Sequence, residues 1–214
     1  MQREQRSGST TVVVVHGLWM TGAVFALQRA QLTRYGYRVA TFSYPSVRLE
    51  LDEIASRLRR FVTALGVPRV HFVGHSLGGL VVLHTLALNT LQSVGRVVLL
   101  GSPVVGSRAA ERLSHSSPGR ALLGRALLEW RVERGIAVAS RFEVGMIAGT
   151  VCFGMGRLLV RLPVPNDGVV CLDETRMPGL RDHLALPLSH SAMILSARVA
   201  RQIRVFLELG HFAH

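Results

Sequence analysis

The residues that decide the fold are Val70-His71-Phe72-Val73-Gly74-His75-Ser76-Leu77-Gly78-Gly79-Leu80. The run from Val70 to Val73 has the apolar, β-branched character of a strand buried on both faces, and an apolar helix is expected from Leu77. Between them, Gly74-x-Ser76-x-Gly78 has the spacing of a nucleophile elbow, a tight turn from strand to helix that exposes the serine hydroxyl above the edge of a sheet. We therefore expect Ser76 to be a nucleophile, with the N-terminus of a helix beneath it.

On both sides of this segment, strand-like and helix-like stretches alternate. Further strands are expected at 11–15, 37–42, 97–100 and 144–148, with a less marked one at 183–186. Helices are expected at about 21–34, 51–65 and 77–91 and in the C-terminal segment, where one stripe contains Leu195, Val199, Ile203, Phe206 and Leu207. This alternation predicts an α/β fold, with a mainly parallel sheet of about six strands and helices on both faces.

The pattern changes between Gly106 and Arg141, where the sequence is arginine-rich and helical and contains the break Ser116-Ser117-Pro118-Gly119. We expect a small helical cap there, inserted at about 107–141 between two strands. An insertion of this length is too short for a second domain. The 214 residues are therefore expected to form a single domain, 1–214.

A second glycine turn, His16-Gly17-Leu18-Trp19, follows the first expected strand. Together with the elbow it resembles the α/β-hydrolase superfamily, and within it the compact bacterial lipase-like serine esterases. In that family, the residue after the His-Gly pair and the residue after the nucleophile supply the backbone N–H groups of the oxyanion hole. The resemblance thus assigns Leu18 and Leu77 to the oxyanion hole, and Trp19 and Met20 are expected in the apolar wall of the substrate pocket.

The chain contains nine histidines, so the general base has to be selected by position. The family order is nucleophile, acid, histidine, which leaves His183 and His190 as candidates. His183 is expected within the last strand. His190 is expected in the loop between that strand and the final helix, where the family has its base, and we select His190.

The acid is expected in Asn166-Asp167-Gly168-Val169-Val170, which resembles the segment that contains the aspartate of the triad in lipase-like enzymes. Asp167 is our candidate. An Asn-Asp-Gly sequence is also a strong signal for an ordinary turn. The alternatives further along the chain are Asp173, Glu174 and Asp182.

These residues predict a serine hydrolase that cleaves carboxylic esters of short or medium acyl chain through an acyl-enzyme intermediate. A minimal cap fits small esters better than long-chain fats. Acyltransferase, thioesterase or amidase activity of the same triad remains open, as does a non-catalytic interaction protein on a hydrolase scaffold. The sequence contains no H-E-x-x-H, G-x-x-x-x-G-K or G-x-G-x-x-G pattern, so we expect neither a metal nor a nucleotide cofactor.

The formal net charge is +12, and all 25 basic residues are arginines that are spread along the chain. Nucleic-acid binding is not expected, because it requires basic residues gathered on one face. Weak attraction to anionic lipid surfaces is compatible with this charge. The polar N-terminus, Met1 to Thr10, has no signal-peptide pattern and the apolar stretch Val144 to Val160 is a poor membrane span, so a cytoplasmic location is expected. Cys152 and Cys171 are expected to be ordinary buried thiols.

Overall fold

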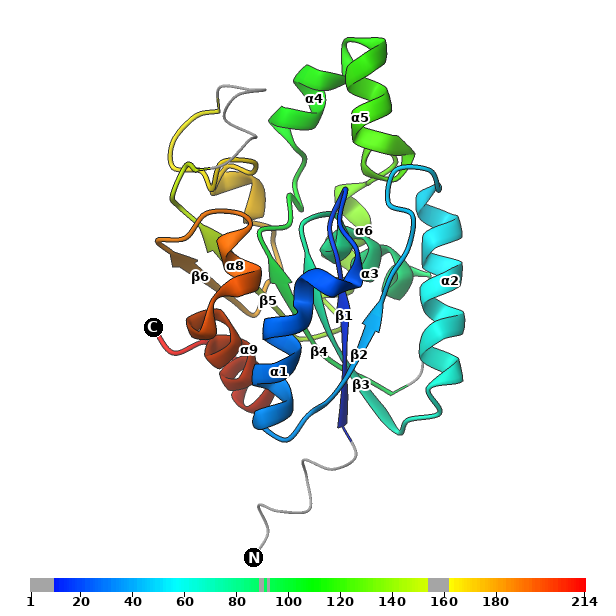
Figure 1. Cartoon of the computed structure of the whole chain (residues 1–214), viewed down its shortest axis with the longest axis vertical. Helices are drawn as coiled ribbons and strands as arrows, with labels where there is room; N and C mark the ends of the chain where they lie inside the picture. Colours follow the sequence, from blue (N-terminus) through cyan, green and yellow to red (C-terminus); the bar gives the residue numbers. More distant parts are fainter. Residues whose placement is uncertain (1–9, 89–90, 92, 154–161) are drawn as a thin grey trace, which may run out of the picture.

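The computed structural model describes residues 10–88, 91, 93–153 and 162–214. Its centre is a six-stranded sheet in the order β2-β1-β3-β4-β5-β6, and every neighbouring pair is parallel (Figure 1). The strands are β1 (Thr10–Val15), β2 (Arg38–Phe42), β3 (Arg69–His75), β4 (Val94–Leu100), β5 (Val144–Gly149) and β6 (Asp182–Leu186). The sheet predicted from the alternating pattern is therefore confirmed, including the last strand.

Continuous apolar runs form these strands because the central ones are buried on both faces. In β1, Val13 and Val15 belong to one hydrophobic core, while Val12 and Val14 belong to the core on the opposite face. Side chains alternate in this way because successive residues of a strand point to opposite sides of the sheet. A run of four valines thus supplies both cores at once.

Helices cover both faces of the sheet (Figure 1). On one face α2, α3 and α6 pack together, and on the other α1 packs against α8 and α9. The helices are α1 (Ala26–Arg34), α2 (Leu51–Ala64), α3 (Leu77–Ala87), α4 (Arg108–Ser114), α5 (Ser117–Leu128), α6 (Val132–Ala139), α8 (Ala192–Leu195) and α9 (Ala197–Leu209), with the short 3₁₀ helices η1 (Gly22–Phe25) and η2 (Asp173–Thr175).

Several boundaries differ from the sequence-based expectation. Strand β4 begins at Val94 rather than at 97. The expected C-terminal stripe is divided, because Leu195 ends α8 and is 59% exposed, whereas α9 begins at Ala197. Strand β3 extends to His75 rather than ending at Val73, because β4 continues to pair with it: Gly74 pairs with Leu99 and His75 with Leu100. Helix α3 ends at Ala87, short of the expected position near 91.

The segment predicted as a cap at about 107–141 contains two different parts. Helices α4 and α5 pack on each other and stand beyond the carboxyl ends of the strands (Figure 1). Helix α6 instead packs on α3, and its residues Val138 and Ala139 belong to the hydrophobic core on that face of the sheet. We propose that the cap consists of α4 and α5 alone, and that α6 belongs to the body of the fold.

Two expectations concern residues outside the described part of the chain. The polar N-terminal segment is described only from Thr10, and the apolar stretch 144–160 only up to Phe153. Within the described ranges, no helix is long and apolar enough to cross a membrane. Of the two cysteines, Cys171 is buried, but Cys152 is only half-buried, because it lies in the loop after β5 rather than in the core.

Candidate active site

Ser76 lies in the turn between β3 and α3 with φ 54° and ψ −123°, a strained conformation for a residue with a side chain. Its backbone N–H donates to Leu100 O at 2.9 Å, which ties the turn to the neighbouring strand. Glycine is required at Gly78, because a Cβ there would lie 2.2 Å from Val15 O. A Cβ at Gly74 would lie 2.5 Å from the Cα of Gly79. The glycine spacing read from the sequence therefore follows from close backbone approach around the serine.

His190 and Asp167 form a buried pair. His190 Nδ1 lies 2.7 Å from Asp167 Oδ2. Because a carboxylate only accepts hydrogen bonds, Nδ1 carries a proton, and in the neutral imidazole Nε2 therefore keeps its lone pair. Asp167 is 1% exposed and His190 6% exposed, so this interaction is shielded from water.

Asp167 is fixed by the turn that contains it. Its Oδ1 accepts the backbone N–H groups of Val169 at 2.9 Å and Val170 at 2.8 Å. Its backbone O accepts the N–H of His190 at 2.9 Å. Asp167 can therefore be both a turn residue and the partner of a histidine. Its Oδ1 accepts the N–H groups of the turn, and its Oδ2 accepts from His190.

The alternative acids make other contacts. Asp173 forms a two-pronged ion pair with Arg108, at 2.7 and 2.8 Å, and this hydrogen bonding lowers the pKa of its carboxyl. Glu174 accepts the N–H of Arg108 at 2.6 Å and that of Cys171 at 2.8 Å, and burial raises the pKa of its carboxyl. Asp182 accepts the N–H of Phe212 at 2.7 Å. None of these carboxylates hydrogen-bonds His190 among the described residues.

His183, the other candidate base, lies in β6 as expected. Its Nε2 is 2.9 Å from Thr175 Oγ1, and burial lowers the pKa of its imidazole to about 4. It does not line the cavity at Ser76. The structure therefore brings His190, and not His183, to the cavity that contains Ser76.

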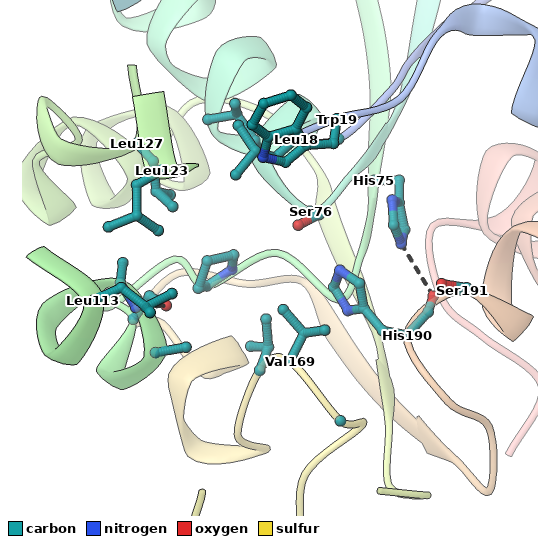
Figure 2. A pocket seen from close by; sticks show the side chains of 18 of the residues that line it. Leu18, Trp19, His75, Ser76, Leu113, Leu123, Leu127, Val169, His190 and Ser191 are labelled. Carbon is teal, nitrogen blue, oxygen red and sulfur yellow. Dashed lines mark hydrogen bonds between the residues drawn. The ribbon is translucent and has the colours of Figure 1, made fainter. Parts of the chain in front are cut away.

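Ser76 and His190 line the same cavity (Figure 2). No hydrogen bond joins the two in the described part of the chain. Such bonds are often long in an unliganded enzyme and shorten when substrate binds. The arrangement can bring a nucleophile, a base and an orienting acid together on one reacting atom.

The cavity has a volume of about 340 Å³, within the usual range for small-molecule sites. The expected wall residues Trp19 and Met20 both line it, as do Leu18 and Leu77. Leucines from the cap close one side (Figure 2): Leu113, Leu122, Leu123 and Leu127. No aspartate, glutamate or arginine is among the described lining residues, so the cavity suits a neutral, largely apolar ligand.

Trp19 connects the first glycine turn to the cap. Its φ is 59°, unusual for a bulky residue, and its backbone N–H donates to Ser46 Oγ at 3.0 Å. Its indole Nε1–H donates to Leu122 O at 2.8 Å. Leu122 lies just before Gly124, whose φ of 69° interrupts α5. The loop that contains Leu18 is thereby held against the cap helix.

Two residues that the sequence analysis did not select also contact the His190–Asp167 pair. Gly101 has φ 54°, and a Cβ there would lie 3.0 Å from Asp167 Oδ2 and 3.2 Å from His190 Nδ1. His75 donates from Nε2 to His190 O at 3.1 Å. For Gly101, the only signal in the sequence was a glycine directly after the strand that became β4. Nothing in the sequence indicated a contact between His75 and His190.

His16 has a structural role. Its Nε2 accepts the N–H of Tyr44 at 3.1 Å, its Nδ1 lies 2.9 Å from Gly17 O, and its ring stacks on that of Tyr44. Burial lowers the pKa of its imidazole. Elsewhere in the described chain, no three His, Cys, Asp or Glu side chains gather as metal ligands.

Residues 12–214 match the model of the alpha/beta hydrolase family, and the chain belongs to that family. Among solved structures, it is similar to the lipase BlEst2 of Bacillus licheniformis in mature form, with a TM-score of 0.72, 21% identity, and coverage of 95% of this chain and 92% of that one. It is also similar to the esterase EaEST of Exiguobacterium antarcticum, with a TM-score of 0.67, 15% identity, and coverage of 94% and 93%. At these identities, the likeness concerns the fold.

Among curated proteins, the chain is similar to the "Putative carbamate hydrolase RutD" of Pantoea ananatis (strain LMG 20103). The two are 33% identical over 117 residues. The match covers 49% of this chain and 41% of that protein, so the chain spans less than half of its length.

Proposed function

We propose that the protein is a serine hydrolase that cleaves neutral carboxylic esters of short or medium acyl chain through an acyl-enzyme intermediate. The observation that carries the proposal is the buried His190–Asp167 pair, at 2.7 Å, in the wall of the cavity that contains Ser76. A histidine with its proton fixed on Nδ1 and its Nε2 free beside a strained serine is the arrangement that nucleophilic acyl transfer requires.

In the proposed mechanism, His190 Nε2 takes the Ser76 hydroxyl proton while Ser76 Oγ attacks the carbonyl carbon of the ester. Asp167 stabilises the imidazolium that forms. His190 then gives the proton to the departing alcohol oxygen as the carbonyl–oxygen bond breaks, which leaves Ser76 acylated. Water repeats the sequence, with His190 as its base, and releases the acid.

The backbone N–H groups of Leu18 and Leu77 are the proposed oxyanion donors. Both residues line the cavity next to Ser76. Adjacent N–H groups anchor the surrounding backbone: Ser76 N–H bonds Leu100 O, and Trp19 N–H bonds Ser46 Oγ. Fixed donors of this kind stabilise the negative oxygen without reorganising, and loss of one typically costs about 3 to 4 kcal/mol of transition-state stabilisation.

The size and polarity of the cavity support the substrate class. A volume of about 340 Å³ closed by cap leucines fits a short or medium acyl chain. The largely apolar lining of the cavity favours a neutral acyl group.

Carbamate hydrolysis is the second candidate, because of the similarity to the protein described as a carbamate hydrolase. The same acyl-transfer steps apply to a carbamate carbonyl. Side-by-side rates on p-nitrophenyl butyrate, a p-nitrophenyl carbamate and butyryl-CoA separate the candidates. We expect the ester to be fastest, and faster turnover of the carbamate or thioester would replace it as the assigned substrate class.

The decisive first test of catalysis is labelling by a fluorophosphonate probe, which phosphonylates an activated serine. We expect the wild-type protein to be labelled at Ser76 and Ser76→Ala to remain unlabelled. A folded wild-type protein that is not labelled would instead be a non-catalytic protein on a hydrolase scaffold.

A further inference from the structure

His75 has no part in the proposed mechanism, although it directly precedes the nucleophile and lines the cavity. Its side chain is fully buried, and its ring centroid lies 4.6 Å from that of His190. Its Nε2 is 3.1 Å from the backbone O of His190, and Figure 2 draws this bond as a dashed line. Because a carbonyl oxygen only accepts, the His75 proton is on Nε2 and donates to His190.

This bond completes the anchoring of His190. The backbone N–H of His190 donates to Asp167 O at 2.9 Å, and its ring Nδ1–H donates to Asp167 Oδ2 at 2.7 Å. Its backbone O accepts from His75. The backbone N–H and the ring of His190 are therefore held by Asp167, and its backbone O is held by His75, which directly precedes Ser76. Only Nε2, the atom that takes the proton, has no partner among the described residues.

The other nitrogen of His75 argues against a purely structural role. His75 Nδ1 is buried and has no hydrogen-bond partner among the described residues. This nitrogen faces Gly17, where an added Cβ would lie 3.1 Å from it. A buried acceptor without a partner lowers stability. An apolar side chain would avoid that loss, but it would also lose the bond to His190.

The protonation state of His75 suits a site next to the base. Burial, together with the nearby His190, holds the pKa of the His75 imidazole well below its usual range. His75 is therefore neutral in the folded protein at neutral pH. A neutral ring does not repel the imidazolium that forms on His190 during attack.

We propose that His75 is a positioning residue: its Nε2–H holds the backbone of His190 so that the His190 ring presents Nε2 to Ser76. This inference rests on the proposed function of Ser76 and His190. It predicts that the donor at position 75, rather than the bulk of the side chain, determines the rate of proton transfer.

The variants His75→Gln and His75→Met test this, since the two side chains have nearly equal length and only Gln has an N–H donor. With p-nitrophenyl butyrate, we expect His75→Met to lower kcat on the order of 10- to 100-fold, the range expected for misplacement of a catalytic group, with KM within about threefold of wild type. His75→Gln is expected to keep kcat within about fivefold. Thermal unfolding identifies the variants that are folded at the assay temperature. If His75→Met is not folded, His75→Leu, which also lacks a donor, replaces it. If neither variant folds, His75→Gln is the remaining test: kcat within about fivefold of wild type supports the inference, and a larger loss overturns it.

The matched control is His71→Met. His71 is also a buried histidine of β3, and its Nδ1 accepts the N–H of Arg96 at 2.6 Å. We expect His71→Met to lower the unfolding temperature but leave kcat unchanged. Equal kcat values in His75→Met and His71→Met, or equal impairment of His75→Met and His75→Gln, would overturn the inference.

Fluorophosphonate labelling rates on the same variants separate this inference from the assignment of substrate. If the wild-type protein is labelled but cleaves no ester, the substrate class is wrong, and the order of labelling rates still tests His75. If the wild-type protein is not labelled at all, the proposed function fails, and the inference fails with it.

Discussion

Replacement of Asp167 by Asn separates a catalytic role from a turn role, and the structure fixes how the amide must lie. The amide oxygen can take the place of Oδ1 and accept from Val169 N–H and Val170 N–H, which are 2.9 and 2.8 Å away. The flipped amide would set its NH₂ against both donors and leave the buried N–H of Val170 and the partly buried N–H of Val169 unpaired, at about 1 to 3 kcal/mol for the buried group. The turn therefore selects the first orientation.

In that orientation the amide NH₂ faces His190 Nδ1, which lies 2.7 Å from Oδ2 in the wild-type protein. A donor at this position requires an acceptor, so the imidazole proton moves from Nδ1 to Nε2. Nε2 then cannot take the Ser76 proton. We expect kcat to fall about 10⁴-fold, the loss typical of the wrong histidine tautomer, equal to about 5 kcal/mol of barrier at 1.36 kcal/mol per factor of ten.

The assay is kcat for p-nitrophenyl butyrate in Asp167→Asn, with far-UV circular dichroism to verify that the fold is intact. Asp173→Asn is the matched control, because Asp173 pairs with Arg108 at the surface, and we expect its kcat to stay within about twofold, as is usual for surface substitutions. Asp167→Asn with kcat within tenfold of wild type would refute the reasoning and leave Asp167 a turn residue only. An inactive Asp173→Asn would place the acid elsewhere.

Three further substitutions test the site. Ser76→Ala should abolish turnover, measured as p-nitrophenol release, and keep the far-UV spectrum, because only the nucleophile is lost; activity within tenfold of wild type would contradict its role. Gly101→Ala should lower kcat at least tenfold and reduce the unfolding temperature, since its Cβ would lie 2.6 Å from Met193 Cε and 3.0 Å from Asp167 Oδ2; unchanged kcat would show that the pair tolerates displacement. Trp19→Phe removes the hydrogen bond from the indole to Leu122 O, which is worth about 0.5 to 1.5 kcal/mol. Because this bond holds the cap, whose leucines line the cavity, KM for p-nitrophenyl octanoate should rise several-fold more than KM for p-nitrophenyl acetate. Equal changes in the two KM values would mean that the bond does not fix the cap.

Features encoded within a few consecutive residues could be predicted from the sequence. The strand–turn–helix at Ser76 was recognisable because the glycine spacing and the change from strand to helical periodicity lie within one short segment. The alternation of elements predicted the parallel sheet for the same reason. Boundaries were less accurate: β3 extends to His75 because its pairing with β4 continues there, and pairing between strands is not visible in the sequence of either one.

Contacts between distant segments were decided by the tertiary structure. His190 meets Asp167 across 23 positions, Trp19 meets Leu122 across 103, and His75 meets His190 across 115. The order of residues in the chain and the expected end of the last strand selected His190 over His183 from the sequence, but only the folded chain brings the loop after β6 to the cavity at Ser76. The sequence by itself determined the elements and the turn that exposes the serine, because these depend on local backbone geometry and hydrophobic periodicity. The hydrogen-bond partner of each polar side chain depends on which distant segments the packed core brings together. Only the tertiary structure determines this.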